Sequence, residues 1–299
     1  MCGIVGLLVK TPALRDRLGE LMLPMLIGMS ERGPESAGLA VFTEPLSGTA
    51  RKYSIYSGAR ASSGWDEFEQ SARHDLGDAV RLDINANHAV LETTAEPHVV
   101  KEWLCHRHAQ YHLLSVGKSI DLYKDTGSPR EVADRYGFAE LSGSHVVGHT
   151  RMATETAVTP ARAHPFTAGE DFCLVHNGSL SNPYSVRRKL EPLGIAFETD
   201  NDTEAACRFL EWRMREGDDL ETSLRKGFDE LDGFYTFLMG TRDELALVRD
   251  AFACKPAIVA ENDDYVAISS EFRSLAKLPD VKNAQLFEPK PEEIYVWRK

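Results

Sequence analysis

Short apolar segments typical of strands occur at both ends of this chain, and a run of helices separates them. From Gly233 to the end the chain is nearly all strand, with turn residues such as Glu261–Asp264 between the segments. Three helices are expected before this region, over Pro183–Leu193, Thr203–Arg215 and Leu220–Leu231. Strands followed by helices and then by strands again favour two stacked antiparallel sheets that are covered by helices.

The expected core strands are short, apolar segments of the kind found in buried sheets. They are Gly3–Val9, Ala37–Phe42, His145–Thr150, Phe172–Val175, Phe234–Met239, Leu245–Arg249, Ala257–Val259, Tyr265–Ser269 and Ile294–Trp297. A helix is expected over Leu14–Ser30. Residues from about 44 to 143 carry more charge and more histidine, and we interpret them as an α/β insertion into the main fold. Its expected elements are strands near Tyr53 and at Ala89–Thr93, and helices at Trp65–Arg73, Pro97–Ala109 and Pro129–Tyr136.

The composition argues against several classes of function. The 299 residues include 34 Lys and Arg against 46 Asp and Glu, and the net charge of −12 disfavours binding to nucleic-acid phosphates. No apolar run approaches the roughly 18 residues of a membrane-spanning helix, and the first residues lack the pattern of a signal peptide. The five cysteines are widely spaced and form no CxxC pair, which is typical of free thiols in a reducing compartment. We therefore expect a cytoplasmic protein.

Cys2 is the strongest candidate for a catalytic residue. Once Met1 is removed, Cys2 carries both a thiol and a free α-amine, and an α-amine with a pKa of about 8 is partly unprotonated near neutral pH. A nucleophile and a general base then lie on one residue. The adjacent Gly3 permits a close approach of other backbone. The alternative is that Cys2 is only a small buried apolar residue at the start of the chain.

The segment Met1–Gly6 resembles the start of the class II glutamine amidotransferases, which belong to the N-terminal-nucleophile hydrolases. Further motifs of this family follow in the family's order. They are Arg32–Gly38, Gly148–Thr154, His164-Pro165, His176–Gly178, Asn201–Glu204, Asp232–Tyr235, Arg249-Asp250 with Lys255-Pro256, and Ser270–Phe272. Each motif is short, but together they extend from residue 2 to residue 272.

The resemblance implies an α+β fold, the N-terminal-nucleophile αββα sandwich, in which two antiparallel sheets lie between layers of helices. Residues 1–299 would form one such domain, and the insertion at about 44–143 is the largest departure from the family. Three segments carry a closer likeness to the stand-alone amidotransferase subunit of N-methylglutamate synthase and other glutamate-synthase-like enzymes. These segments are Ala139–Pro165, His176–Asn182 and Asp250–Pro256.

The resemblance also assigns residues to the two charged ends of glutamine. Arg151 would hold the α-carboxylate with two parallel hydrogen bonds, a contact that a planar guanidinium makes well. Asp202 would accept hydrogen bonds from the α-ammonium. An alternative for Asp202 is the N-cap of the helix that begins near Thr203. The two roles can coexist, because a carboxylate has two oxygens.

The remaining site residues surround the reacting amide. Cys2 would attack the side-chain carbonyl, while the Asn177 side chain and the Gly178 backbone N–H would form an oxyanion hole, worth roughly 3–4 kcal/mol per donor. Taken alone, the dipeptide Asn177-Gly178 favours a tight hairpin turn. The family resemblance favours the oxyanion hole instead. Thr154 is expected to line the glutamine pocket, and Arg32 to organise the loop near Cys2.

Three histidines, His149, His164 and His176, raise the alternatives of a Cys–His dyad or a metal site. In the family the α-amine is the base, so these histidines are expected to be structural. No pair of them has the spacing of a zinc motif such as HExxH. We expect no metal and no cofactor in this chain, and a flavin in a partner subunit.

The expected reaction is hydrolysis of glutamine to glutamate and ammonia through a γ-glutamyl thioester on Cys2. Because a free glutaminase would waste glutamine, we expect a partner synthase subunit of the N-methylglutamate or glutamate synthase type, flavin-dependent, that accepts the ammonia in a hetero-oligomer. Two alternatives stay open. One is an independent hydrolase of small amides, and the other is a catalytically silent regulatory subunit.

Overall fold

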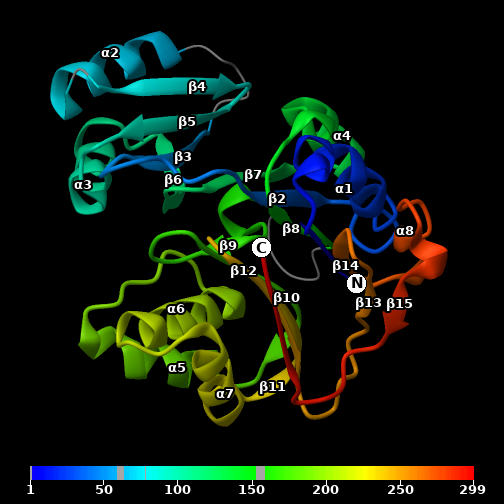
Figure 1. Cartoon of the computed structure of the whole chain (residues 1–299). Coiled ribbons are helices and arrows are strands. Elements are labelled where there is room, and N and C mark those ends of the chain that lie inside the picture. Colours follow the sequence, from blue (N-terminus) through cyan, green and yellow to red (C-terminus); the bar gives the residue numbers. More distant parts are fainter. Residues whose placement is uncertain (1, 59–63, 78, 153–158) are drawn as a thin grey trace.

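The computed structural model describes residues 2–58, 64–77, 79–152 and 159–299, and Figure 1 shows the arrangement of its elements. Two antiparallel sheets are stacked face to face, and a third, smaller sheet lies beside them. The first sheet has seven strands in the order β15-β13-β14-β1-β8-β2-β7. They are β1 (Gly3–Val9), β2 (Ser36–Phe42), β7 (Ile120–Thr126), β8 (His145–Arg151), β13 (Ile258–Glu261), β14 (Tyr265–Ser269) and β15 (Gln285–Phe287).

The second sheet has five strands in the order β16-β12-β11-β10-β9. They are β9 (Phe166–Thr167), β10 (Phe172–Leu180), β11 (Gly233–Thr241), β12 (Glu244–Arg249) and β16 (Ile294–Arg298). Helices α1 (Leu18–Ile27), α4 (Pro129–Tyr136) and α8 (Phe272–Leu275) pack on the first sheet. Helices α5 (Pro183–Leu190), α6 (Asp202–Arg215) and α7 (Leu220–Glu230) pack on the second sheet. This layer order confirms the expected αββα sandwich.

Alternation of side chains along β1 explains why this strand is apolar at almost every position. Ile4 and Leu8 point into the core between the two sheets. Val5 and Leu7 point to the opposite face, where they pack with the residues of α1. A strand that is buried on both faces needs apolar residues on both, so the sequence loses the alternation typical of a half-exposed strand.

The third sheet has the order β4-β5-β3-β6, with β3 (Arg51–Ser57), β4 (Arg81–Asn85), β5 (His88–Thr93) and β6 (Tyr111–Gly117). Helices α2 (Trp65–Leu76) and α3 (Pro97–Arg107) share its apolar core. This unit falls within residues 51–117. Strand β7 and helix α4, which the sequence analysis includes in the insertion at about 44–143, belong to the first sheet and its helix layer.

The two chain connections to the third sheet run side by side. Phe42 at the end of β2 is paired with Ile120 at the start of β7. The Thr43 N–H donates to the Ser119 carbonyl over 2.9 Å. The unit is therefore inserted at the tip of what would otherwise be a simple β2–β7 hairpin.

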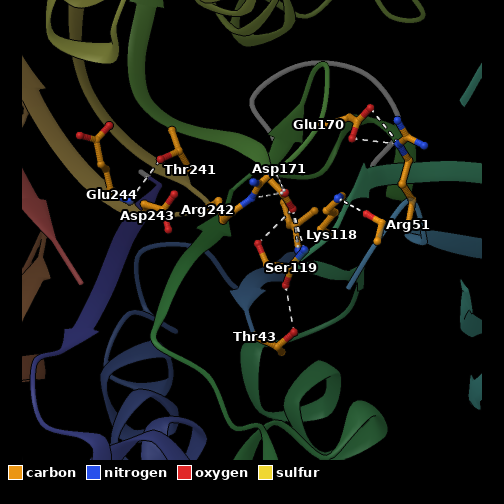
Figure 2. Close-up of polar contacts among 12 residues, drawn as sticks. Thr43, Arg51, Lys118, Ser119, Glu170, Asp171, Thr241, Arg242, Asp243 and Glu244 are labelled. Carbon is orange, nitrogen blue, oxygen red and sulfur yellow. Dashed lines mark hydrogen bonds and ion pairs between the residues drawn. The ribbon is translucent and has the colours of Figure 1, made fainter. Parts of the chain in front are cut away.

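One buried carboxylate joins the base of the third sheet to both sheets of the sandwich (Figure 2). Asp171 lies just before β10, and its Oδ1 accepts from the backbone N–H of Ser119 at 2.8 Å and of Ile120 at 3.1 Å. Its other oxygen accepts from Nε of Arg242 at 3.0 Å. Next to it, Glu170 bonds the Arg51 guanidinium of β3 at 3.0 Å. The third sheet is thus fixed at its base by charged hydrogen bonds as well as by the chain itself.

Candidate active site

Cys2 lies half-buried immediately before β1, at one end of the first sheet. Its backbone carbonyl accepts two hydrogen bonds, from Arg32 Nε at 2.9 Å and from Asn177 Nδ2 at 3.1 Å. The Arg32 guanidinium also bonds Glu271 at 2.7 Å. Arg32 comes from the loop between α1 and β2, so three distant segments of the chain fix the position of Cys2.

Asn177 and Gly178 lie inside strand β10, paired with Thr236 and Tyr235 of β11. The hairpin turn that this dipeptide favours by itself is therefore absent from this position. Gly178 has a φ of 142°, and a Cβ there would collide with the carbonyl oxygen of Phe234. Only glycine fits this backbone without displacement of β11.

The strand pairing also sets the direction of the Gly178 backbone. Both backbone groups of Tyr235 bond Asp250, the N–H at 2.9 Å to Oδ1 and the carbonyl at 3.0 Å to the Asp250 N–H. The N–H and C=O of one strand residue point to the same side. Tyr235 therefore directs its groups away from Gly178. The Gly178 N–H, in turn, faces away from β11.

Ser270 is a site residue for which the sequence analysis had no role, although it recognised the Ser270–Phe272 motif. The Ser270 hydroxyl lies 3.1 Å from Asn177 Nδ2 and 3.0 Å from the backbone nitrogen of Ile4. The Ser270 N–H also donates to the Ile4 carbonyl at 3.0 Å. Ser270 thereby joins the start of β1 to the amide side chain beside Cys2.

Arg151 is the last residue of β8, and the register pairs the residue before it, Thr150, with Gly3. Arg151 and Cys2 therefore lie at the same end of the first sheet. Nη1 of Arg151 donates to the backbone carbonyl of Arg162 at 2.8 Å, which holds the guanidinium from one side. Thr154, expected to line the glutamine pocket, lies outside the described residues.

Asp202 is the first residue of α6, but it is not the helix cap. Asn201 is the N-cap, since its side chain accepts from the Thr203 N–H at 2.8 Å. The cap alternative for Asp202 is therefore wrong. One oxygen of Asp202 accepts from the Leu180 N–H at 2.9 Å, and the side chain keeps 26% of its surface exposed. Because Leu180 ends β10, this bond ties Asp202 to the strand that carries Asn177.

The three histidines form a buried cluster beneath these residues. The His149 and His164 rings are 4.1 Å apart between centroids, and the Thr203 hydroxyl lies 2.9 Å from His164 Nε2 and 3.0 Å from His176 Nδ1. Burial lowers the pKa of His149 to about 3 and that of His164 well below its usual value, so both imidazoles are neutral near pH 7. Thr203 is a second residue that sequence reasoning left without a role.

The site therefore presents a thiol-bearing residue, an amide N–H donor, a guanidinium and a carboxylate at one end of the sandwich. A cation and an anion in this arrangement complement the carboxylate and ammonium of a free amino acid. None of the helices in the described ranges is both long and apolar enough to cross a membrane.

Comparison with known proteins agrees with this geometry. Residues 149–277 match a family described as the glutamine amidotransferase domain. The chain is 45% identical to the glutamine amidotransferase-like protein GlxB of Rhizobium meliloti, over 99% of this chain and 98% of that protein. It is 28% identical to a putative glutamine amidotransferase of Methanothermobacter thermautotrophicus, over 99% of both chains.

The solved structures show the same fold. Glutamine phosphoribosylpyrophosphate amidotransferase from B. subtilis superimposes with a TM-score of 0.63 at 18% identity, and the match covers 99% of this chain. This chain spans about half of that protein, 47% of its length. At this identity the likeness shows the fold alone. The family is shown by the sequence relatives, and the chain belongs to the class II glutamine amidotransferases.

Proposed function

We propose that this chain is the glutaminase subunit of a larger synthase, and that it hydrolyses glutamine through a thioester on Cys2. The observation that carries the proposal is the contact at 3.1 Å between the Asn177 side-chain amide and the Cys2 carbonyl. It brings the expected oxyanion donor next to the expected nucleophile, although 175 positions separate them in sequence.

Removal of Met1 would free the α-amine of Cys2, which takes the thiol proton. The thiolate then attacks the side-chain carbonyl carbon of glutamine. When the tetrahedral intermediate collapses, the C–N bond breaks and the α-ammonium of Cys2 returns its proton to the leaving ammonia. Water hydrolyses the thioester to glutamate, so one glutamine and one water give one glutamate and one ammonia.

Asn177 and Gly178 would stabilise the negative oxygen of the tetrahedral intermediate. The Gly178 N–H faces away from β11, which suits a donor that must reach a substrate atom. The Asn177 amide spans Cys2 and Ser270 at 3.1 Å each, so one of these two bonds would be exchanged for a bond to the oxyanion. The direction of the Gly178 N–H is fixed by the strand before the reaction, so this donor costs little reorganisation as the charge develops.

Arg151 and Asp202 would select an α-amino acid. The Arg151 guanidinium is anchored on the Arg162 carbonyl through Nη1 at 2.8 Å, and a guanidinium has further N–H donors for a carboxylate. Asp202 is anchored through one oxygen on Leu180 at 2.9 Å. Each residue is thus held by the protein and still has capacity for the substrate.

The partner would be a flavin-dependent synthase subunit of the N-methylglutamate or glutamate synthase type. Support comes from the likeness of Ala139–Pro165, His176–Asn182 and Asp250–Pro256 to the stand-alone subunits of such enzymes. Ammonia that is protonated in bulk water loses its nucleophilicity, so a sheltered route to a second subunit has a chemical advantage. No metal or cofactor in this chain takes part in the proposed mechanism.

The first experiment tests the nucleophile. Intact-mass analysis of active protein should show the loss of Met1, and a brief incubation with glutamine followed by an acid quench should trap a γ-glutamyl adduct on Cys2. Cys2→Ala should fold and give neither adduct nor ammonia. Full activity with Met1 retained, or in Cys2→Ala, would refute the proposed mechanism.

The second experiment tests the partner. The chain is purified from its native source under mild conditions, and glutamine hydrolysis is measured with and without the co-purified subunits and their acceptor substrate. We expect slow hydrolysis by the chain alone and several-fold stimulation in the complex. A chain that runs alone, with turnover indifferent to any co-encoded synthase subunit, would favour the independent hydrolase.

A further inference from the structure

Lys124 is a buried lysine on β7 that the proposed mechanism does not use. It is 4% exposed, and its ammonium donates to the carbonyls of Ala163 at 2.9 Å and Pro165 at 3.1 Å. The same ammonium lies 5.1 Å from the centre of the Phe166 ring. It forms no ion pair with a carboxylate within the described ranges.

The carbonyls that Lys124 bonds belong to a short segment that supports the glutamine site. Within residues 162–165, the carbonyl of Arg162 anchors Arg151 at 2.8 Å, and the carbonyls of Ala163 and Pro165 bond Lys124. His164 lies between the two carbonyls that Lys124 holds. Lys124 therefore fixes the backbone on both sides of His164. This backbone follows directly after Arg162, whose carbonyl anchors Arg151.

His164 carries this support to the other end of the substrate. Its Nε2 lies 2.9 Å from the hydroxyl of Thr203. Thr203 follows Asp202 in α6, and its hydroxyl is 3.4 Å from Asp202 Oδ1. The residues proposed for the α-carboxylate and the α-ammonium of glutamine are thus both connected to residues 162–165.

We propose that Lys124 is a positioning residue for glutamine binding, whose ammonium fixes residues 162–165 so that Arg151 and Asp202 keep the separation that an α-amino acid requires. This inference rests on the proposed roles of Arg151 and Asp202. Lys124 touches no reacting atom, so its loss should weaken binding of glutamine rather than slow the chemistry on bound glutamine.

Physical chemistry supports a specific role for this charge. Burial of an ammonium without a carboxylate is unfavourable, and it lowers the pKa of Lys124 to about 8. A methionine would fill a similar volume without that cost, but it would leave two buried carbonyls without their donor. Gly38 on β2 packs against the same place, since a Cβ there would collide with the carbonyl oxygen of His164.

The chain contains a matched control on the neighbouring sheet. Lys52 on β3 is also buried, at 8% exposure, and it bonds Asp121 of β7 at 2.9 Å. Lys52 and Lys124 thus both carry a buried ammonium, one bonded to a carboxylate and the other to backbone carbonyls. Lys52 joins the third sheet to β7, whereas Lys124 holds the backbone of residues 162–165.

The test compares Lys124→Met and Lys124→Gln with Lys52→Met in the full-length protein. Glutamine affinity is measured by calorimetry in a Cys2→Ala background, and KM and kcat are measured with Cys2 intact. Alkylation of Cys2 by iodoacetamide, which lacks both charged ends of glutamine, reports the thiol itself. Lys124→Gln keeps an N–H donor and supplies the comparison if Lys124→Met does not fold.

We expect both Lys124 variants to bind glutamine about tenfold more weakly and to raise KM by a similar factor, with kcat and the alkylation rate within about threefold of the parent. Lys52→Met should lose thermal stability without a change in affinity. Unchanged affinity in a folded Lys124 variant, or an equal loss in Lys52→Met, would overturn the inference. Activity that survives Cys2→Ala would instead refute the proposed nucleophile, and the calorimetric comparison would still decide the role of Lys124.

Discussion

Lowering the pH from about 7.5 to about 5.5 should destabilise this protein through its buried histidines. His88, His145, His149 and His164 are all exposed by 5% or less. Burial lowers the pKa of His88 and His149 to about 3, that of His145 to about 4, and that of His164 well below its usual value. These four side chains stay neutral in the folded protein across this pH range.

The magnitude follows from proton binding in the two states. In the unfolded chain an imidazole with its ordinary pKa of about 6.5 binds a proton as the pH falls below that value. The unfolded state then binds more protons than the folded state, so the free energy of unfolding decreases as the pH is lowered. Each histidine contributes roughly 1.4 kcal/mol of loss by pH 5.5, and the four together about 5 kcal/mol. This loss is close to zero above about pH 6.5 and grows as the pH falls, until the folded pKa values are reached.

The assay is urea unfolding followed by tryptophan fluorescence at both pH values. His145→Gln provides a single-site comparison away from the active site, because His145 bonds the Thr241 carbonyl at 2.7 Å and stacks on Phe42. This variant should lose about 1 kcal/mol less than the parent on acidification. Asp121, whose pKa is raised by burial, acts in the opposite direction, so the difference between the two proteins is the decisive quantity. A parent loss below about 1 kcal/mol, or an identical loss in His145→Gln, would refute the reasoning.

Three substitutions test the site directly. Cys2→Ala should abolish ammonia release while leaving the unfolding midpoint within a few degrees of the parent, as judged by circular dichroism; a folded variant that still releases ammonia would contradict this. Asn177→Asp should lower kcat by about 100- to 1,000-fold, because it replaces an oxyanion donor with a negative charge. Steady-state kinetics measures this, and a kcat near that of the parent would contradict the oxyanion role. Arg151→Lys should mainly raise KM for glutamine, because one point charge replaces a two-pronged contact, and an unchanged KM would exclude the carboxylate role.

Much of the sandwich could be predicted because its strands are recognisable from their local sequence alone. Gly3–Val9 and Tyr265–Ser269 have the same bounds in the structure as in the sequence analysis. Both are continuous apolar runs, as burial on both faces requires. Strand β10 was expected to end at Val175, but it continues to Leu180. Pairing with β11 outweighs the local turn preference of Asn177-Gly178, and such pairing leaves no local mark in the sequence.

One strand that escaped prediction, β7, is rich in charged residues. Strand β7 contains Asp121, Lys124 and Asp125, all of which are buried in the structure. A buried charged side chain is accepted only where a partner exists, and that partner is distant in sequence. For Asp121 the partner is Lys52, while for Lys124 it is a pair of backbone carbonyls. Since backbone carbonyls occur at every residue, no residue pattern could have indicated this contact.

The adjacency of Phe42 and Ile120 has a consequence for the order of folding. Strands β2 and β7 would pair readily across a two-residue turn, but here they must close a loop of about 75 residues. Loop closure costs about 0.6 kcal/mol for each doubling of length, so this closure costs about 3 kcal/mol more than a short turn if the loop is unstructured. Most of that cost disappears once the third sheet has formed, because its base already holds the two ends together. Nucleation of the β2–β7 edge should therefore wait for the inserted unit, and the rate at which the glutaminase sandwich closes should depend on a sheet that contributes none of its proposed catalytic residues.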